Sequence, residues 1–397
     1  MQLPPEIHDE ILRYLDRQDT AVYRLVSRSF AIAGTPPLFE RLHFRTSLES
    51  LQRLAHISQR ECGRHVKHLL WNTTGAEFEA RAFLEGLRTR ELKYILGRPA
   101  PAPAPPTHTD EQSSPSLGVS VLAAIFSGFP TLKTLHVLTS RTSPSAYGND
   151  GWAHRLSLDP DATPDPWPPA WKATRGCPRC RGLCQAVEST GLYEMHAGTL
   201  AAHAAGRPLT ALRVEHLTLC AAPAGGVVQG FELALAHVTS LELVLGMRKR
   251  NVGRIQRLLG AMPHLRALRL WLNSASWWAD VDHDAPLPNL ADVFPARDGL
   301  PALRELEVHQ FDVAQDFLEE FLLRRAGTLR VLRMHRMRLW PRGSWLALFA
   351  ALKGRLGALE VVWLCGEFGG EIGQGVGTGW NMDEDGGREM ERWLLER

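Results

Sequence analysis

The stretch LRALRLWL, residues 265–272, decides the fold of most of this 397-residue chain. Its leucines alternate with other residues, which is the period of a β-strand that buries one face. The pattern L-x-x-L-x-L/V returns at several other places. These copies are LKTLHVL (132–138), VEHLTLC (214–220), VTSLELVL (238–245), LRELEVHQF (303–311), LRVLRMHRM (329–337) and LEVVWLCG (359–366). Such repetition indicates a series of similar structural units rather than one enclosed core.

Helical segments precede several of these strands, among them VGRIQRLLGAM (252–262) and AQDFLEEFLLRRA (314–326). One strand with its helix cannot bury its own apolar face, so such units stack and their strands form a parallel sheet. The pattern resembles leucine-rich repeats of an irregular kind, although the Asn or Cys that usually follows the strand is mostly missing. The resemblance implies an α/β fold, an irregular leucine-rich-repeat-like solenoid with a parallel sheet on its concave face.

Residues between and just after the core leucines point outward from such a sheet. They form an exposed ridge that combines aromatic, basic and acidic side chains, and interfaces favour Trp and Arg as anchors. We therefore expect the ridge to bind a protein substrate, the alternative being that its tryptophans pack beneath long loops. The expected contacts are Arg269, Trp271, Glu307, His309, Arg333, His335 and Trp363, and His136, Thr218 and Glu242 continue the same ridge.

The first forty-five residues have a different pattern, that of short amphipathic helices. Ile7, Ile11 and Leu15 form one apolar stripe, which begins after Pro4 and Pro5. Asp19 is the expected N-cap of a second helix. The apolar side of that helix would contain Val22, Leu25, Val26 and Phe30, and Pro36-Pro37 would end it. A segment this small cannot be stable alone, so it must dock onto the rest of the chain or onto another protein.

The string L-P-x-E-I-x-x-x-I-L-x-x-L-x-x-x-D, followed by R-L-V-S-R-x-F and P-x-L-F, resembles an F-box over about residues 2–44. The resemblance implies a helical motif that binds a Skp-type adaptor and, through it, a cullin-based ubiquitin ligase. The implied adaptor-binding residues are Leu3, Pro4, Ile7, Ile11, Leu15, Leu25, Val26, Ser27 and Phe30. The chain would be a non-catalytic receptor whose repeat domain recruits a substrate for ubiquitination. The alternatives are a non-degradative interaction scaffold and a zinc-containing structural protein.

Composition divides the chain further. The expected domains are an F-box (1–45), a helical, first repeat-like segment (46–97), a disordered Pro/Ala/Ser-rich linker (98–117) and a degenerate leucine-rich-repeat domain (118–397). Within 46–97 we expect helices at about 48–57 and 76–96, with a strand at 65–71. The last domain would contain a long insertion at about 140–178 and a Gly-rich loop near 366–380.

The sequence gives only weak signals for nucleic-acid binding, metal binding or catalysis. A net charge of +2 argues against a dedicated nucleic-acid binder. Cys177, Cys180 and Cys184 are weak zinc candidates, because a structural site needs four ligands and no second C-x-x-C pair is present. Catalytic motifs are lacking, so we expect neither an enzyme nor a cofactor. The thinly spread cysteines suggest reduced thiols in the cytoplasm or nucleus, and no apolar run is long enough to span a membrane.

Overall fold

The computed structural model divides the chain into two compact units, which we call unit 1 (Met1–Ala186 and Tyr193–Leu209) and unit 2 (Val187–Leu192 and Thr210–Arg397). The residues that the structure describes are 3–73, 83–84, 86–87, 89–97, 117–138, 191–218, 231–246, 252–272, 288–295, 299–340, 343–368, 380–382 and 392–395. Among these residues no helix is long and apolar enough to cross a membrane.

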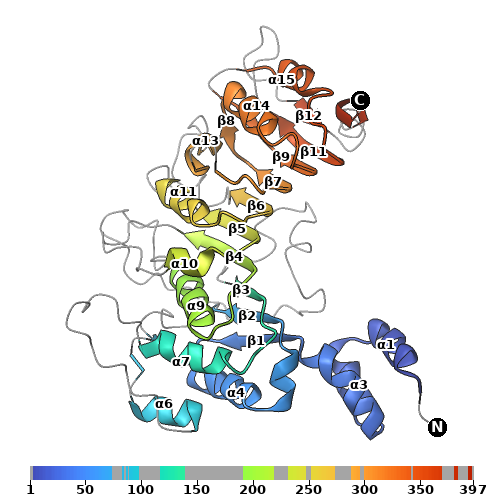
Figure 1. Cartoon of the computed structure of the whole chain (residues 1–397), viewed down its shortest axis with the longest axis vertical. Coiled ribbons are helices and arrows are strands. Elements are labelled where there is room, and N and C mark those ends of the chain that lie inside the picture. The colour runs from blue at the N-terminus through green and yellow to red at the C-terminus, as the bar shows by residue number, and fades with distance from the viewer. Residues whose placement is uncertain are drawn as a thin grey trace, which may run out of the picture. The chain divides into compact units, whose positions relative to one another are not determined.

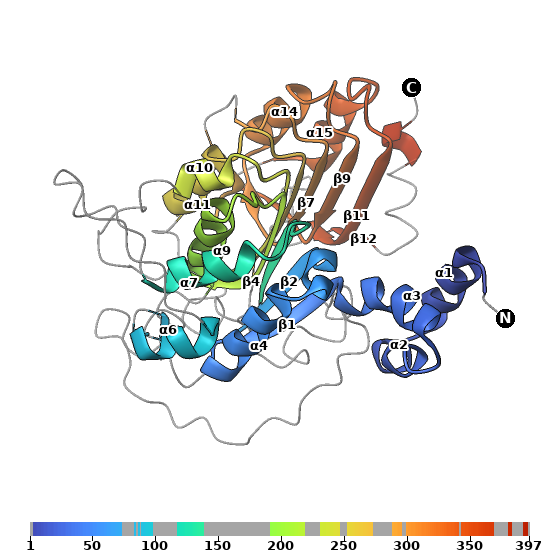
Figure 2. The same cartoon turned by 60° about the horizontal axis from the view of Figure 1, so that its bottom comes forward.

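Unit 1 begins with three helices, α1 (Pro5–Tyr14), α2 (Arg17–Tyr23) and α3 (Arg28–Phe39). Helix α3 packs against both α1 and α2, so the three form one cluster (Figure 2). The C-terminal end of α3 leads directly into the first strand, β1 (Arg41–Arg45). The helical N-terminus that the sequence predicts is therefore confirmed.

The remainder of unit 1 is a parallel sheet with the strand order β1-β2-β3 and its helices. Leu42, Leu69 and Leu135 lie in register across the three strands and are buried. The elements after β1 are α4 (Leu48–Ser58), the 3-10 helix η1 (Glu61–His65), β2 (His68–Asn72), α6 (Thr89–Leu96), α7 (Leu117–Phe126), β3 (Thr134–Leu138) and α9 (Leu192–Ala204).

Unit 2 repeats this arrangement with the strand order β4-β5-β6-β7-β9-β11-β12. All neighbouring pairs are parallel except β11 and β12, which are antiparallel. Its strands are β4 (Ala211–Thr218), β5 (Ser240–Gly246), β6 (Ala267–Leu272), β7 (Glu305–His309), β8 (Asp312–Val313), β9 (Val331–His335), β10 (Arg338–Leu339), β11 (Val361–Phe368) and β12 (Trp380–Met382). Its helices are α10 (Phe231–Leu235), α11 (Val252–Gly260), α13 (Leu290–Val293), α14 (Gln315–Leu323) and α15 (Trp345–Leu352). Strands β8 and β10 form a separate parallel pair.

The core of unit 2 is built from residues that share one register across the parallel strands. Leu241, Leu268 and Leu306 are at most 1% exposed, and they are aligned on β5, β6 and β7. Helices α10, α11, α13 and α14 cover this side of the strands (Figure 1). Alternate residues point to the other side, which we call the sheet face of each unit.

The strands β7 and β9 end in the same unusual way. Gln310 and Arg336, which follow them directly, have φ values of 63° and 49°. Their backbone N–H groups donate to the carbonyls of His335 and Cys365 on the next strands, at 2.9 and 3.1 Å. The chain then enters β8 or β10, where Arg338 forms two hydrogen bonds of 2.7 and 2.8 Å with buried Asp312. Two neighbouring strands of unit 2, β7 and β9, therefore end in the same kink, and a short strand follows each of them.

The structure confirms the mixed α/β fold with N-terminal helices and a parallel sheet. Each of the seven quoted phrases overlaps a strand, although β4 begins three residues before VEHLTLC. Strand β1 was not predicted. The expected Gly-rich loop (366–380) is wrong at its ends, because Gly366–Phe368 belong to β11 and pair with β12. In 76–96 the described helix α6 spans only Thr89–Leu96. The insertion (140–178) lies outside the described residues, as does the linker (98–117) except at its end, where the prediction is wrong because Leu117 begins α7.

Candidate functional site

Short polar side chains define where the first helices begin. Asp16 is the N-cap of α2, since it has an extended backbone and its Oδ1 accepts the Asp19 N–H at 2.7 Å. The prediction that Asp19 is the cap is therefore wrong, because Asp19 already lies in the first turn. Ser27 caps α3 in the same way by accepting the Phe30 N–H. Two caps divide a segment that the sequence predicted as one helix.

The expected end of the helix at Pro36-Pro37 is also wrong, because α3 continues through both prolines to Phe39. Proline removes a backbone N–H donor, and here that loss falls in the last turn of the helix. Gly34, which is also in α3, lies close to the C-terminal end of α2. A Cβ atom there would be 2.6 Å from Cγ of Arg24, so only glycine allows α3 to approach α2 this closely.

Three rings hold the helices together from inside. Nδ1 of His8 on α1 and the hydroxyl of Tyr23 on α2 are hydrogen-bonded at 2.6 Å. The ring of Phe30 on α3 lies 4.9 Å from that of His8 and 4.6 Å from that of Tyr23. Burial raises the pKa of Tyr23, so its hydroxyl stays protonated and uncharged. The ring contacts, in which His8 and Tyr23 are buried and Phe30 is partly exposed, thus do not use the aliphatic side chains on the outside of the helices.

Large apolar side chains are exposed on the same helices. The exposed fractions are 84% for Leu25, 65% for Val26 and 47% for Ile7. Tyr14, Val22 and Ile32 are also exposed. A cluster of such residues on one small motif is typical of a binding surface.

We call the nine residues that the F-box resemblance implies the adaptor surface. None of them is buried: Pro4, Ile7, Leu25, Val26 and Ser27 are exposed, and Leu3, Ile11, Leu15 and Phe30 are partly exposed. They lie on α1 and α3, in the segment before α1, and in the connections on either side of α2. Their accessibility is compatible with a shared interface, and their role in one stays a prediction.

The sheet face of unit 2 carries a row of alternating charges. Arg213, Glu242, Arg269, Glu307 and Arg333 lie in register on β4, β5, β6, β7 and β9, and we call this row the charge ladder. Glu242 lies 2.8 Å from Arg213 and 3.4 Å from Arg269. Glu307 lies 3.5 Å from Arg269 and 3.6 Å from Arg333. Each acidic side chain is therefore shared between two basic ones.

A second row beside the ladder consists of rings, which we call the ring stack. Trp271, His309 and His335 lie in register on β6, β7 and β9, with centroid distances of 5.5 and 4.9 Å. Trp363 on β11 stacks on His335 at 6.0 Å and 10°. Parallel strands bring such rings within van der Waals reach of one another.

Burial lowers the pKa of both histidines in the stack. For His335 it falls to about 3, through desolvation first and then through the charges of His309 and Arg336. Desolvation also lowers the pKa of His309, although Glu307 opposes this. Burial acts to raise the pKa of Glu307, but the hydrogen bond with His309 and the nearby arginines lower it on balance. Because Glu307 is a carboxylate, His309 Nε2–H is the donor in their 3.3 Å contact.

The described ridge residues of unit 2 are thus brought together on its sheet face, but the prediction that the ridge stands exposed is wrong for several members. His136, Glu307, His309 and His335 are buried, whereas Arg269 and Arg333 keep 41% and 33% of their side chains exposed. For the three buried members in unit 2, the physical reason is that neighbours on adjacent strands cover one another by ion pairing and ring stacking. Trp271 and Trp363 are partly exposed, and the side chain of Thr218 lies outside the described set. Whether these residues contact a substrate stays a prediction.

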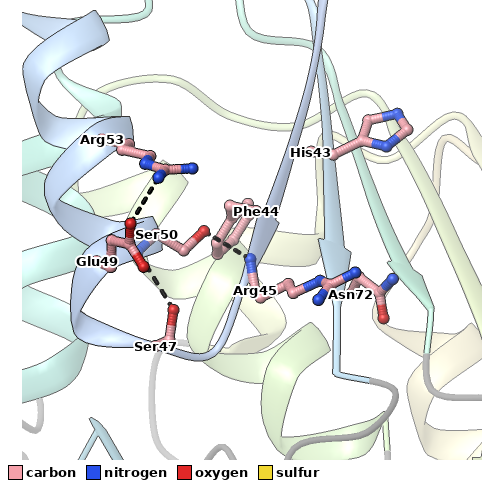
Figure 3. Close-up of a pocket in the computed structure, with 8 residues that line it drawn as sticks. All are labelled: His43, Phe44, Arg45, Ser47, Glu49, Ser50, Arg53 and Asn72. Carbon is pink, nitrogen blue, oxygen red and sulfur yellow. Dashed lines mark hydrogen bonds and ion pairs between the residues drawn. The ribbon is translucent and has the colours of Figure 1, made fainter. Parts of the chain in front are cut away.

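A polar pocket of about 400 Å³ lies beside the end of β1, and its lining residues come from β1, β2 and the first turns of α4 (Figure 3). The backbone N–H of Arg45 donates to Oγ of Ser50 at 2.8 Å, and Arg53 pairs with Glu49 at 2.5 Å. The lining is His43, Phe44, Arg45, Ser47, Glu49, Ser50, Arg53 and Asn72. Sequence reasoning missed this pocket because β1 has no repeat phrase.

The zinc candidates Cys177, Cys180 and Cys184 lie outside the described residues. Among the residues that are described, no group of three or more His, Cys, Asp or Glu side chains could hold a metal ion. Cys62 and Cys365 are partly exposed and are not joined in a disulfide bond.

Comparison with known proteins identifies one segment. Residues 1–36 match the family model described as the F-box domain, and no curated protein matches the chain. The matched residues coincide with α1, α2 and most of α3, where the exposed apolar side chains lie. F-box proteins are typically non-catalytic. The match supports an F-box protein, and an F-box domain implies binding to a Skp-type partner of a ubiquitin ligase.

Proposed function

We propose that this chain is the substrate receptor of a Skp–cullin–F-box ubiquitin ligase, acting in the cytoplasm or nucleus. The observation that carries the proposal is the F-box domain match at residues 1–36, on helices that leave large aliphatic side chains exposed. A receptor needs no active site of its own. Holding a substrate beside the ubiquitin-charged enzyme raises its effective concentration and so accelerates transfer.

The adaptor surface is the proposed contact with the Skp-type protein. Burying a fully exposed aliphatic side chain in an interface stabilises a complex by about 2 kcal/mol. Leu25 and Val26 are available for this because the cluster of His8, Tyr23 and Phe30 does not use them. The aliphatic side chains proposed to bind an adaptor are thus different from the rings that hold the three helices together, and Phe30 alone belongs to both sets.

We further propose that the sheets of both units are degenerate leucine-rich repeats that select the substrate. Support comes from the buried leucines that recur in register on β5, β6, β7 and β9, as stacked repeats require. The proposed substrate-contacting residues are the accessible members of the ridge, Arg269, Trp271, Arg333 and Trp363.

The double substitution of Ile7→Ala and Leu25→Ala tests the adaptor surface. Each truncation of an interface aliphatic is expected to cost about 2 kcal/mol, so adaptor capture should fall at least about a hundredfold. The measurement is binding of the purified full chain to a purified Skp-type adaptor. Leu233→Ala with Leu346→Ala is the matched control, because these exposed leucines lie on α10 and α15 of unit 2.

Equal capture of the double variant and the control would contradict the assignment. Addition of a cullin separates the receptor from the non-degradative scaffold. A receptor brings the cullin down together with the adaptor, whereas a scaffold binds the adaptor alone.

A further inference from the structure

The sheet face of unit 1 differs in charge from the ladder of unit 2. Its nine register positions on β1, β2 and β3 are Arg41, His43, Arg45, His68, Leu70, Asn72, Thr134, His136 and Leu138. None of these is acidic, and the three on β1 are exposed. We call Arg41, His43, Arg45 and His68 the basic face.

Basic side chains also predominate around His68. Its pKa is lowered by burial first, and then by the nearby cations Arg41, Lys67 and Lys133, which together outweigh Glu40. Glu40 is the acidic group here, and it forms a 2.9 Å ion pair with Lys67. Burial is thus the main cause of the lowered pKa, and the neighbouring cations add to it in the direction that the composition of the face indicates.

The pocket described above extends the basic face past the end of β1. His43, Arg45 and Asn72 reach it from the strands, while Arg53 reaches it from α4 (Figure 3). Its acidic member, Glu49, is in an ion pair with Arg53. Arg41 and Arg45 are four residues apart on an extended strand, so their Cα atoms are separated by roughly 13 Å. Carboxylates four residues apart on an extended peptide have the same spacing.

We propose that the basic face and its pocket bind a carboxylate-rich segment of a protein partner in extended conformation. The argument is charge complementarity: Arg41 and Arg45 lie exposed on a face whose register positions include no Asp or Glu. A short acidic peptide fits better than a nucleic acid, because the chain is nearly neutral, at +2, and a polyanion would extend beyond this patch. The proposal rests on the proposed function only for identifying this partner as the substrate.

The test is fluorescence anisotropy with the full chain and a labelled peptide of about nine residues in which Glu alternates with Ser. A peptide with Gln in place of Glu is the neutral probe. We expect the Glu peptide to bind the wild type and to lose at least about tenfold in affinity for the Arg41→Glu, Arg45→Glu variant. A peptide with Lys in place of Glu should bind that variant better than it binds the wild type.

Arg257→Glu with Arg266→Glu is the matched control, since it changes the net charge equally at two exposed arginines of unit 2. It should bind the Glu peptide within about twofold of the wild type. Equal binding of the Gln and Glu peptides, an equal loss in the control, or tighter binding of a single-stranded oligonucleotide of matched charge would each overturn the proposal. If the reversed variant does not fold, Arg41→Gln with Arg45→Gln replaces it, with the same expected direction.

Adaptor capture by the same variants separates this proposal from the proposed function. Loss of peptide binding with intact adaptor capture supports the basic face. A chain that captures the adaptor but never binds the Glu peptide sinks this inference and leaves the F-box role standing.

Discussion

In unit 2 the five residues of the charge ladder alternate in sign, whereas the basic face of unit 1 presents Arg41, His43 and Arg45 on one strand with no acidic residue opposite them. Both regions are parallel strands of the same pattern, and both contain arginines at outward positions. The difference shows that an outward arginine in a repeated strand has two distinct uses. It can pair with a carboxylate in register on the neighbouring strand, or it can lie exposed where the register positions of the neighbouring strand hold no carboxylate.

The comparison is tested most severely at the centre of the charge ladder, where we expect the largest change in the free energy of unfolding. Glu307→Gln removes a nearly buried carboxylate that contacts Arg269, Arg333 and His309. We expect a loss of about 2 kcal/mol in the free energy of unfolding, because Arg333 loses this ion pair and Arg269 loses one of its carboxylate partners. Chemical denaturation of the purified chain measures it.

Glu305→Gln is the control on the same strand, since its side chain is 43% exposed and lies 3.9 Å from Arg269. It should cost less than about 0.5 kcal/mol, as exposed ion pairs contribute little. Similar losses for both variants would mean that the ladder does not stabilise unit 2.

Acidification is expected to have the next largest effect, through the ring stack. An unfolded histidine binds a proton as the pH falls below its usual pKa of about 6.5, whereas folded His335 has a pKa of about 3. The free energy of unfolding therefore has its full value above about pH 6.5. It decreases as the pH falls from there toward 3, because only the unfolded chain gains a proton at this histidine. Between pH 7 and pH 5 the chain should lose on the order of 1–2 kcal/mol, measured by denaturation at each pH.

His335→Phe keeps a ring in the stack and removes the titration. Its stability should depend less on pH over the same interval. A variant with the wild-type pH dependence would assign that dependence to other groups.

The smallest effect is expected in unit 1. Arg41→Ala should change the free energy of unfolding by less than about 0.5 kcal/mol, because this exposed side chain faces no acidic residue in register. Thermal denaturation beside Arg333→Ala, from the ladder, sharpens the contrast. A loss for Arg41→Ala as large as that for Arg333→Ala would remove the distinction between the two faces.

Much of the fold could be predicted from the sequence because its signal is local. The period of two in LRALRLWL is enough to identify β6, and the spacing of similar phrases is enough to predict a parallel sheet. Strand β1 was missed because RLHFR, although it alternates, is short and lacks the L-x-x-L-x-L/V phrase. Asp16 and Asp19 are equally good caps by residue type, so only the backbone geometry distinguishes them.

The properties of the sheet face could not be predicted in the same way, because they depend on register between strands far apart in sequence. Arg269 and Glu307 lie on strands joined by a long connection, and such connections differ in length along the chain. Their pairing therefore cannot be predicted from either phrase alone. The burial of His309 between Trp271 and His335 has the same origin. Arg213 was missed although ALRVEHL places it beside leucine in the usual pattern.

The left-handed kinks after β7 and β9 have a consequence for how such a sheet can lengthen. Gln310 and Arg336 are 26 positions apart, as are Asp312 and Arg338. The backbone N–H at each kink donates to a carbonyl of the next strand. A copy of the block that runs from one kink to the next would therefore add a strand together with the N–H donor that binds the strand after it. Duplicating such a block would extend the sheet by about 4.8 Å without changing which side chains point outward. This region of the chain is therefore suited to growth by gene-segment duplication, with the alternation of side chains inherited intact.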